Sequence, residues 1–143
     1  MKNTLEYPRR MDAKVKWEKG MRFVGVGPSG HTVAMDAGGE VGGANSAPRP
    51  TELLLCALGG CTGMDIVSIL EKMRTPARSL EIVISAERAP EHPKAFRTAK
   101  LLFRAEGVPE ENLRKAAQLS HERYCSVGSS LSTEITIEVE ARP

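Results

Sequence analysis

The sequence predicts an α+β fold, in which an antiparallel β-sheet packs with a buried central helix and a second helix. Three observations lead to this class: four short segments alternate apolar with polar residues, one long apolar segment starts at a proline, and another segment has apolar residues at helical spacing. The length of 143 residues fits one domain, so we expect residues 1–143 to form a single domain.

The first third of the chain predicts an antiparallel meander. Residues 13–18 alternate apolar with charged side chains, which is the period of a half-buried strand. Glycine-rich turn signals separate this strand from two more, over 21–26 and 31–35. Residues 37–49 are rich in Gly, Ala, Asn, Ser and Pro and lack the ending of a phosphate-binding loop, so we expect a flexible connector.

Pro50 begins the central helix, because proline is favoured at the first helical position. Glu52 lies in the first turn, where a carboxylate complements the helix dipole, and the helix runs to about Met73. Residues 53–58 are apolar on nearly every face. We therefore expect a buried helix and, since one exposed face would not suit it, an obligate homodimer.

Three glycines surround a cysteine in this helix: Gly59, Gly60 and Gly63 flank Cys61. Each glycine costs roughly 1 kcal/mol relative to alanine in a helix interior. Close approach of another backbone, of a ligand or of a neighbouring helix would explain all three.

The second half predicts two strands over 80–86 and 99–105, a helix and a last strand over 135–139. The helix opens at Pro109 and ends near residues 125–128. The element order is thus βββ-α-ββ-α-β, with mostly antiparallel strands.

Composition narrows the class of function. The net charge is +2 without a basic block, which gives nucleic-acid binding little support. No run reaches about 18 apolar residues, so we expect no transmembrane helix and no membrane partner. Residues 1–16 lack the apolar region of a signal peptide, and we expect a cytoplasmic protein. Since a lasting disulfide is unusual there, a disulfide among the three cysteines would be transient and catalytic.

Cys61 and Cys125 are the strongest candidates for functional residues in the sequence. They lie 64 residues apart on the two predicted helices, and together they would form a pair that cycles between dithiol and disulfide. The alternative is two unrelated buried cysteines. His121 shares a helical face with Cys125, as in a Cys–His pair or half a zinc site. However, Cys56 points to a different face from Cys61, so we expect no metal site. We expect His121 to lie on the helix surface and Cys56 to be a core residue.

A reactive Cys61 would need a cation, because it lies too deep in its helix for the N-terminal dipole to act strongly. Arg22, Arg49 and Arg123 are the candidates. Asp65 lies one turn beyond Cys61 on the same face. An unpaired carboxylate there would raise the pKa of the thiol, so we expect Asp65 to have its own partner or to face solvent.

At these residues the chain resembles the OsmC/Ohr superfamily of thiol-dependent peroxide-detoxifying proteins. The resemblance lies in Pro50-x-Glu52-Leu53-Leu54 with Cys61 eleven residues after the proline, and in Tyr124-Cys125-Ser126-Val127-Gly128. The run from Gly59 to Asp65 is most similar to the less characterised OsmC-like branch. The order of strands and helices agrees over essentially the whole chain.

The resemblance implies an intertwined homodimer with two active sites at its interface. Cys61 would be the peroxidatic thiolate and Cys125 the resolving thiol, and an external dithiol would reduce their disulfide without any cofactor. The reductases carry a glutamate directly after the proline, where this chain has Thr51, with Glu52 one position later. They also carry an arginine in the first hairpin, to which Arg22 is the nearest match.

Two classes of function therefore compete. The first is an enzyme, a thiol-dependent peroxidase that reduces organic hydroperoxides in oxidative-stress defence. The second is a dimeric redox sensor or a protein that binds a small apolar ligand. Turnover with a dithiol reductant distinguishes the enzyme from the sensor, which would be oxidised once without turnover.

Overall fold

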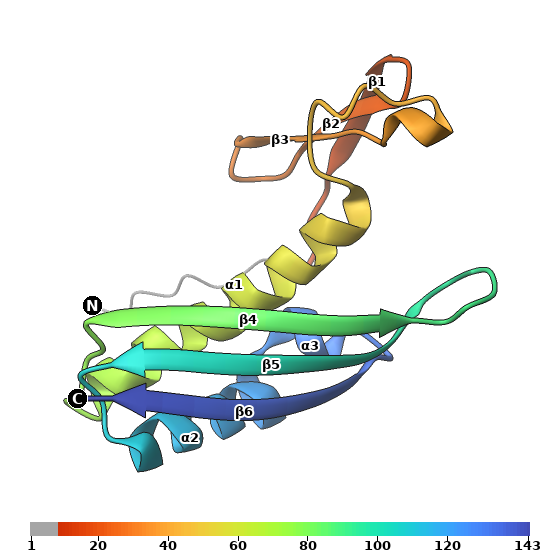
Figure 1. Ribbon diagram of the computed structural model, residues 1–143. Coiled ribbons are helices and arrows are strands. Elements are labelled where there is room, and N and C mark those ends of the chain that lie inside the picture. The colour runs from red at the N-terminus through yellow and green to blue at the C-terminus, as the bar shows by residue number, and fades with distance from the viewer. Residues whose placement is uncertain (1–8) are drawn as a thin grey trace. The chain divides into compact units, whose positions relative to one another are not determined.

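The computed structural model describes residues 9–143. These residues divide after Leu53 into two compact units, residues 9–53 and Leu54–Pro143. The α+β class is confirmed, because each unit contains a three-stranded sheet and the chain forms one long helix and several short ones after the first sheet (Figure 1). That residues 1–143 form one domain stays a prediction. Residues 1–8, the beginning of the polar stretch in which we expected no signal peptide, lie outside the described residues.

The N-terminal unit contains the predicted antiparallel meander, with strands β1 (Lys14–Lys19), β2 (Arg22–Val26) and β3 (Thr32–Met35) in that order. Alternation predicted the strands correctly, but the expectation of a half-buried first strand is wrong. Trp17 is 63% exposed, although it pairs with Phe23 across the sheet. The reason is that a three-stranded sheet has no second layer of its own to cover its apolar face.

Residues 37–49 are not a flexible connector, because the buried Asp36 organises them. Its carboxylate accepts hydrogen bonds from the Ala37 N–H (2.7 Å), the Ala44 N–H (3.3 Å), the Ser46 N–H (3.1 Å) and the Ser46 hydroxyl (2.6 Å). These bonds, that of the Ser46 hydroxyl foremost, hold the pKa of Asp36 well below its usual range. A short 3₁₀ turn, η1 (Gly39–Val41), lies within the loop.

Helix α1 (Pro50–Lys72) begins at the predicted proline and ends one residue before the predicted end. The Glu52 carboxylate accepts the Arg49 N–H at 2.9 Å, as the third residue of a capping box does. By length and mean hydropathy (1.9) α1 could cross a membrane, contrary to our expectation from the longest apolar run. A third of this apolar window is buried within the described residues.

The C-terminal unit is built on strands β4 (Ser79–Arg88), β5 (Phe96–Glu106) and β6 (Glu134–Arg142). β4 and β5 are antiparallel, whereas β6 runs parallel to β5, which the sequence did not predict. The parallel pairing follows from the helical crossover that connects the two strands.

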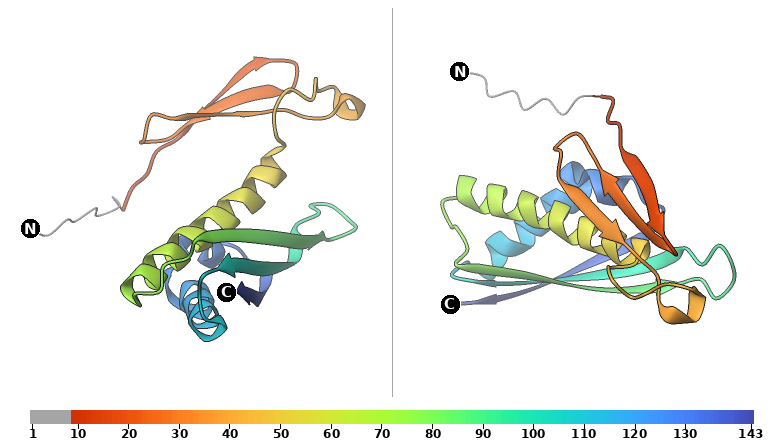
Figure 2. Two further views of the ribbon diagram at one scale, coloured as in Figure 1. Left: turned by 60° about the vertical axis from the view of Figure 1, so that its left-hand side comes forward. Right: turned by 90° about the horizontal axis from the view of Figure 1, so that it is seen from above.

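That crossover is interrupted rather than continuous. It consists of α2 (Glu110–Leu119), a π-helical turn η2 (Ser120–Tyr124) and the short α3 (Ser126–Ser129), with Cys125 between the last two. The helix predicted to run to residues 125–128 therefore ends six residues earlier. Figures 1 and 2 show α1, α2 and α3 on the same face of the β4–β5–β6 sheet.

The core lies between this face and the helices. Its largest fully buried side chains are apolar with one exception, and they are Phe103, Leu58, Ile66, Leu70, Leu101, Leu113 and Ser120. α1 is not buried all round as predicted, because a second stripe of it is exposed, including Met64 (75%) and Val67 (46%). Cys56 lies on that stripe, so its assignment to the core is wrong for the single chain.

Two of the three glycines in α1 allow the helix to lie close to β4. A Cβ on Gly59 would lie 2.8 Å from Ile84 Cδ1, and one on Gly63 would lie 2.9 Å from Ile82 Cδ1. Gly60 faces open space, with nothing within 4 Å of a Cβ. The close approach is thus between a helix and a sheet, not between two helices.

Gly59→Ala should lower the free energy of unfolding by up to about 1 kcal/mol relative to Gly60→Ala, because the terminal methyl of Ile84 must move aside. Both changes gain the same helix propensity, but only the first overpacks a contact. Chemical denaturation of the two variants measures the difference. Equal stability of the two would contradict the packing role of Gly59.

Candidate functional site

The structure brings Cys61 and Cys125 together. Cys61 is half-buried on α1, Cys125 is 2% exposed between η2 and α3, and the two thiols are neighbours, close enough for Cys61 to raise the pKa of Cys125. The alternative of two unrelated cysteines does not fit this contact. The site is therefore a dithiol with one sulfur nearer to solvent than the other.

The π turn places Cys125 at this position. The Cys125 N–H donates to the Ser120 carbonyl, five residues earlier, at 2.8 Å. The backbone at Cys125 then becomes extended, and its sulfur accepts the Gly128 N–H at 3.2 Å, as the N-cap of α3. A Cβ on Gly128 would lie 3.2 Å from that sulfur and 3.5 Å from Leu58 Cδ1, so glycine leaves room for the thiol.

The pKa of the Cys125 thiol is raised to about 11, foremost by burial and in smaller part by the neighbouring Cys61 and Asp65, while the Gly128 N–H lowers it. At neutral pH Cys125 is consequently a thiol with a proton to donate. Its sulfur accepts the Gly128 N–H.

Asp65 has a partner, as expected. Its carboxylate accepts a hydrogen bond from the buried Ser120 hydroxyl at 2.8 Å. Since Ser120 also accepts the Cys125 N–H through its carbonyl, one residue connects the carboxylate on α1 to the cysteine beyond the π turn.

The other predicted helpers lie in the N-terminal unit. Arg22 forms an ion pair with Glu18 (2.7 Å) and donates to the Ser46 hydroxyl (2.9 Å), and Glu52 caps α1 through the Arg49 N–H. Any role of Arg22 or Glu52 in activating the thiol stays a prediction.

The remaining candidates are on the surface or have partners. The Arg49 side chain donates to the Asn45 side-chain oxygen at 2.5 Å, and Arg123 is exposed. His121 is exposed too, whereas Cys125 is buried, so the π turn separates the two residues that a regular helix would align. Within residues 9–143, no three His, Cys, Asp or Glu side chains are grouped to hold a metal ion.

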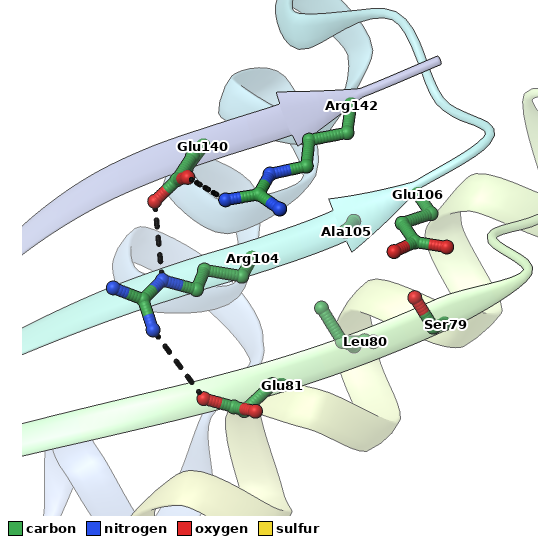
Figure 3. A pocket seen from close by; sticks show the side chains of 8 residues that line it. All are labelled: Ser79, Leu80, Glu81, Arg104, Ala105, Glu106, Glu140 and Arg142. Carbon is green, nitrogen blue, oxygen red and sulfur yellow. Dashed lines mark hydrogen bonds and ion pairs between the residues drawn. The ribbon is translucent and has the colours of Figure 1, made fainter.

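The opposite face of the sheet carries charged side chains and a hollow of about 390 Å³ (Figure 3). There Arg104 bridges Glu81 (3.6 Å) and Glu140 (3.1 Å), and Arg142 pairs with Glu140 (3.0 Å). Arg142 and Arg104 hold the pKa of Glu140 below its ordinary value. Neither cysteine lines this hollow, because both lie on the helical side of the sheet.

The sequence profile of the OsmC-like protein family matches residues 43–140. The chain belongs to this family. The match contains Glu52, Cys61 and Cys125 but not Arg22. The protein YhfA of Escherichia coli K12 is 39% identical to this OsmC-like chain over 129 residues, which cover 89% of the chain and 93% of YhfA.

Solved structures share the OsmC-like fold. A protein from Aquifex aeolicus VF5 is 27% identical, with a TM-score of 0.82 over 94% of this chain and 98% of its own. An organic hydroperoxide resistance protein from Legionella pneumophila is 14% identical, with a TM-score of 0.68 over 94% of this chain and 97% of its own.

Sequence reasoning missed Ser120. A signal was available, because Leu113, Ala116 and Ala117 define a buried helix face on which Ser120 falls, three and four residues after the alanines. A hydroxyl at such a position needs a buried partner.

The stability of this protein should fall between pH 9 and 11 because of Cys125. Its pKa of about 11 lies above the ordinary value of 9.0, so the folded chain holds the proton more tightly than the unfolded chain. The contribution is complete below pH 9 and is lost as pH rises to about 11, by roughly 2–3 kcal/mol. Denaturation across this range should show a smaller pH dependence for Cys125→Ala than for the wild type. Parallel pH profiles would contradict the shift.

Proposed function

We propose that this protein is a thiol-dependent peroxidase, which reduces organic hydroperoxides in oxidative-stress defence. The observation that carries the proposal is the proximity of a half-buried and a buried thiol on an OsmC-like chain. The fold shared with a hydroperoxide resistance protein from Legionella pneumophila supports it. We place the reaction in the cytoplasm, where thiols are kept reduced.

The reaction balances in three steps. The Cys61 thiolate attacks the terminal oxygen of a hydroperoxide, so that the O–O bond breaks, an alcohol leaves and Cys61 becomes a sulfenic acid. Cys125 then attacks the Cys61 sulfur, an S–S bond forms, and the hydroxyl leaves as water with the Cys125 proton. An external dithiol finally reduces the disulfide by exchange and is itself oxidised.

The environments of the two thiols favour this division of roles. Cys61 is nearer to solvent, where a hydroperoxide can arrive, and Cys125 is buried and protonated. A protonated, buried thiol is a poor first nucleophile, but it is well placed to supply both a sulfur and a proton to a neighbouring sulfenic acid.

We further propose that Arg22 and Glu52 assist the Cys61 thiolate, as the resemblance to the reductases implies. Arg22 is the nearest match to the arginine of their first hairpin. Glu52 stands one position later than their glutamate, about 100° further around the helix, which makes its contribution the weaker one.

We also propose a homodimer. α1 exposes an apolar stripe at four- and three-residue spacing, Cys56, Gly60, Met64 and Val67, and β1 exposes Val15 (60%) and Trp17 (63%). Exposed apolar side chains of this kind, on each unit taken by itself, mark an interaction site. A second copy of the chain is the partner that the resemblance to intertwined dimers implies.

Mild hydroperoxide treatment should form a Cys61–Cys125 disulfide. Cys61→Ser should abolish sulfenate formation, whereas Cys125→Ser should still form it and then accumulate sulfenate or sulfinate, because no thiol resolves it. Peptide mapping by mass spectrometry and steady-state peroxide consumption with a dithiol reductant measure both effects.

Cys56→Ala is the control, and it should keep peroxide consumption because Cys56 lies off the thiol pair. A Cys56–Cys125 link, or equal losses from the two serine variants, would overturn the assigned roles. A single oxidation of the wild type without turnover would show a redox sensor instead of a peroxidase.

Val67→Glu should convert the dimer to a monomer. Val67 is 46% exposed in the single chain, so the new charge disturbs the interface more than the core of the chain. Val83→Glu is the matched control, since Val83 is 37% exposed on β4 away from the apolar stripe. Sedimentation of both variants at micromolar concentration checks this. A monomeric wild type, or equal behaviour of the two variants, would contradict it.

A further inference from the structure

We propose that Asp65, through its hydrogen bond to Ser120, is a positioning residue that sets Cys125 as the resolving thiol. This inference rests on the proposed function and concerns its second step. It assigns a role to a carboxylate and a buried hydroxyl that the thiol chemistry itself does not require.

The geometry forms a continuous path from one helix to the second cysteine. The Ser120 hydroxyl donates to Asp65 at 2.8 Å, and the Ser120 carbonyl accepts the Cys125 N–H at 2.8 Å. Asp65 lies four residues after Cys61, on the same flank of α1. One end of the π turn is thus attached to the helix that carries Cys61, at the level of the sulfur that Cys125 must reach.

Ser120 is fully buried, and a buried hydroxyl that loses its partner costs about 1–3 kcal/mol. This penalty makes the hydrogen bond to Asp65 a strong constraint on the turn. Without this hydrogen bond the turn is less constrained, and the Cys125 sulfur can move away from Cys61. A misplacement of about 1 Å can slow a reaction about 100-fold.

The charge of Asp65 has a second, separable effect. The ionisable groups that act on Cys125 are Cys61 and Asp65, both on α1, and both disfavour the Cys125 thiolate. The charged residues of the π turn, His121, Glu122 and Arg123, are exposed. Asp65 therefore helps to keep Cys125 protonated until Cys61 has been oxidised.

Asp65 takes no part in the chemical change of the disulfide-forming step. The Cys125–Cys61 S–S bond forms as the S–O bond of the sulfenic acid breaks, and the Cys125 proton leaves on the hydroxyl as water. Asp65 gains and loses no proton.

Four variants separate the hydrogen bond from the charge. Ser120→Ala keeps the charge and removes the donor, and Asp65→Ala removes charge and acceptor. Asp65→Asn removes the charge and keeps an acceptor for Ser120. Ser129→Ala is the matched control, because it removes an exposed hydroxyl near Cys125 that makes no hydrogen bond to the described residues.

Closure of the Cys61–Cys125 disulfide is followed by stopped-flow quenching and intact mass from pH 6 to 10. Ser120→Ala and Asp65→Ala should close roughly 10- to 100-fold more slowly than the wild type. Asp65→Asn should close at a rate near that of the wild type, with its pH profile displaced to lower pH, and Ser129→Ala should match the wild type. A purely structural residue would change the rate without displacing the profile.

Closure is measured twice, after hydroperoxide and after oxidised glutathione, which forms a mixed disulfide at Cys61 without any peroxide chemistry. No sulfenate at Cys61 in any variant would overturn the proposed function, while the glutathione series would still test the positioning role. Unchanged closure in Ser120→Ala and Asp65→Ala, or an undisplaced profile in Asp65→Asn, would overturn the inference. If Ser120→Ala does not fold, the two Asp65 variants decide the question.

Discussion

The thiol pair depends on how closely α1 lies against β4. Gly59 and Gly63 face Ile84 and Ile82 so tightly that a Cβ on either glycine would come within 3 Å of an isoleucine methyl. Since these glycines face the sheet, Leu58, Cys61 and Asp65 lie on the flank of the helix that contacts η2 and α3. The roughly 1 kcal/mol that each glycine costs in helix propensity is thus connected to the position of the Cys61 sulfur.

The second constraint is the interruption of the crossover between β5 and β6. A regular helix through residues 110–128 would keep Cys125 in line with His121, on an exposed face. The π turn redirects the chain, so that Cys125 enters the core, caps α3 and contacts Cys61. π turns occur frequently at functional sites, where one extra residue changes the direction of a side chain. Here the change converts a surface position into a buried thiol.

Much of the fold was predictable, because its signals are local. Four strands, β1, β4, β5 and β6, follow from alternation, and β2 and β3 follow from the turn signals that bound them. α1 follows from Pro50 and the apolar run after it. The direction of β6 could not be read in this way, since alternation is the same in parallel and antiparallel strands. The loop after β3 was misjudged as flexible, because its order comes from one carboxylate, Asp36, bonded to groups as far as Ser46.

The candidate site, too, has features that local sequence predicts and features that depend on tertiary structure. The sequence by itself determined that two cysteines on helical segments are accompanied by small residues and by an acidic residue one turn after Cys61. Only the tertiary structure decided that the two cysteines are neighbours, that Cys125 is buried with a raised pKa, and that Ser120 binds Asp65. The physical reason is that helical periodicity specifies faces within one segment, whereas a contact over 55 or 64 residues depends on packing between segments and on a π turn that no local pattern predicts.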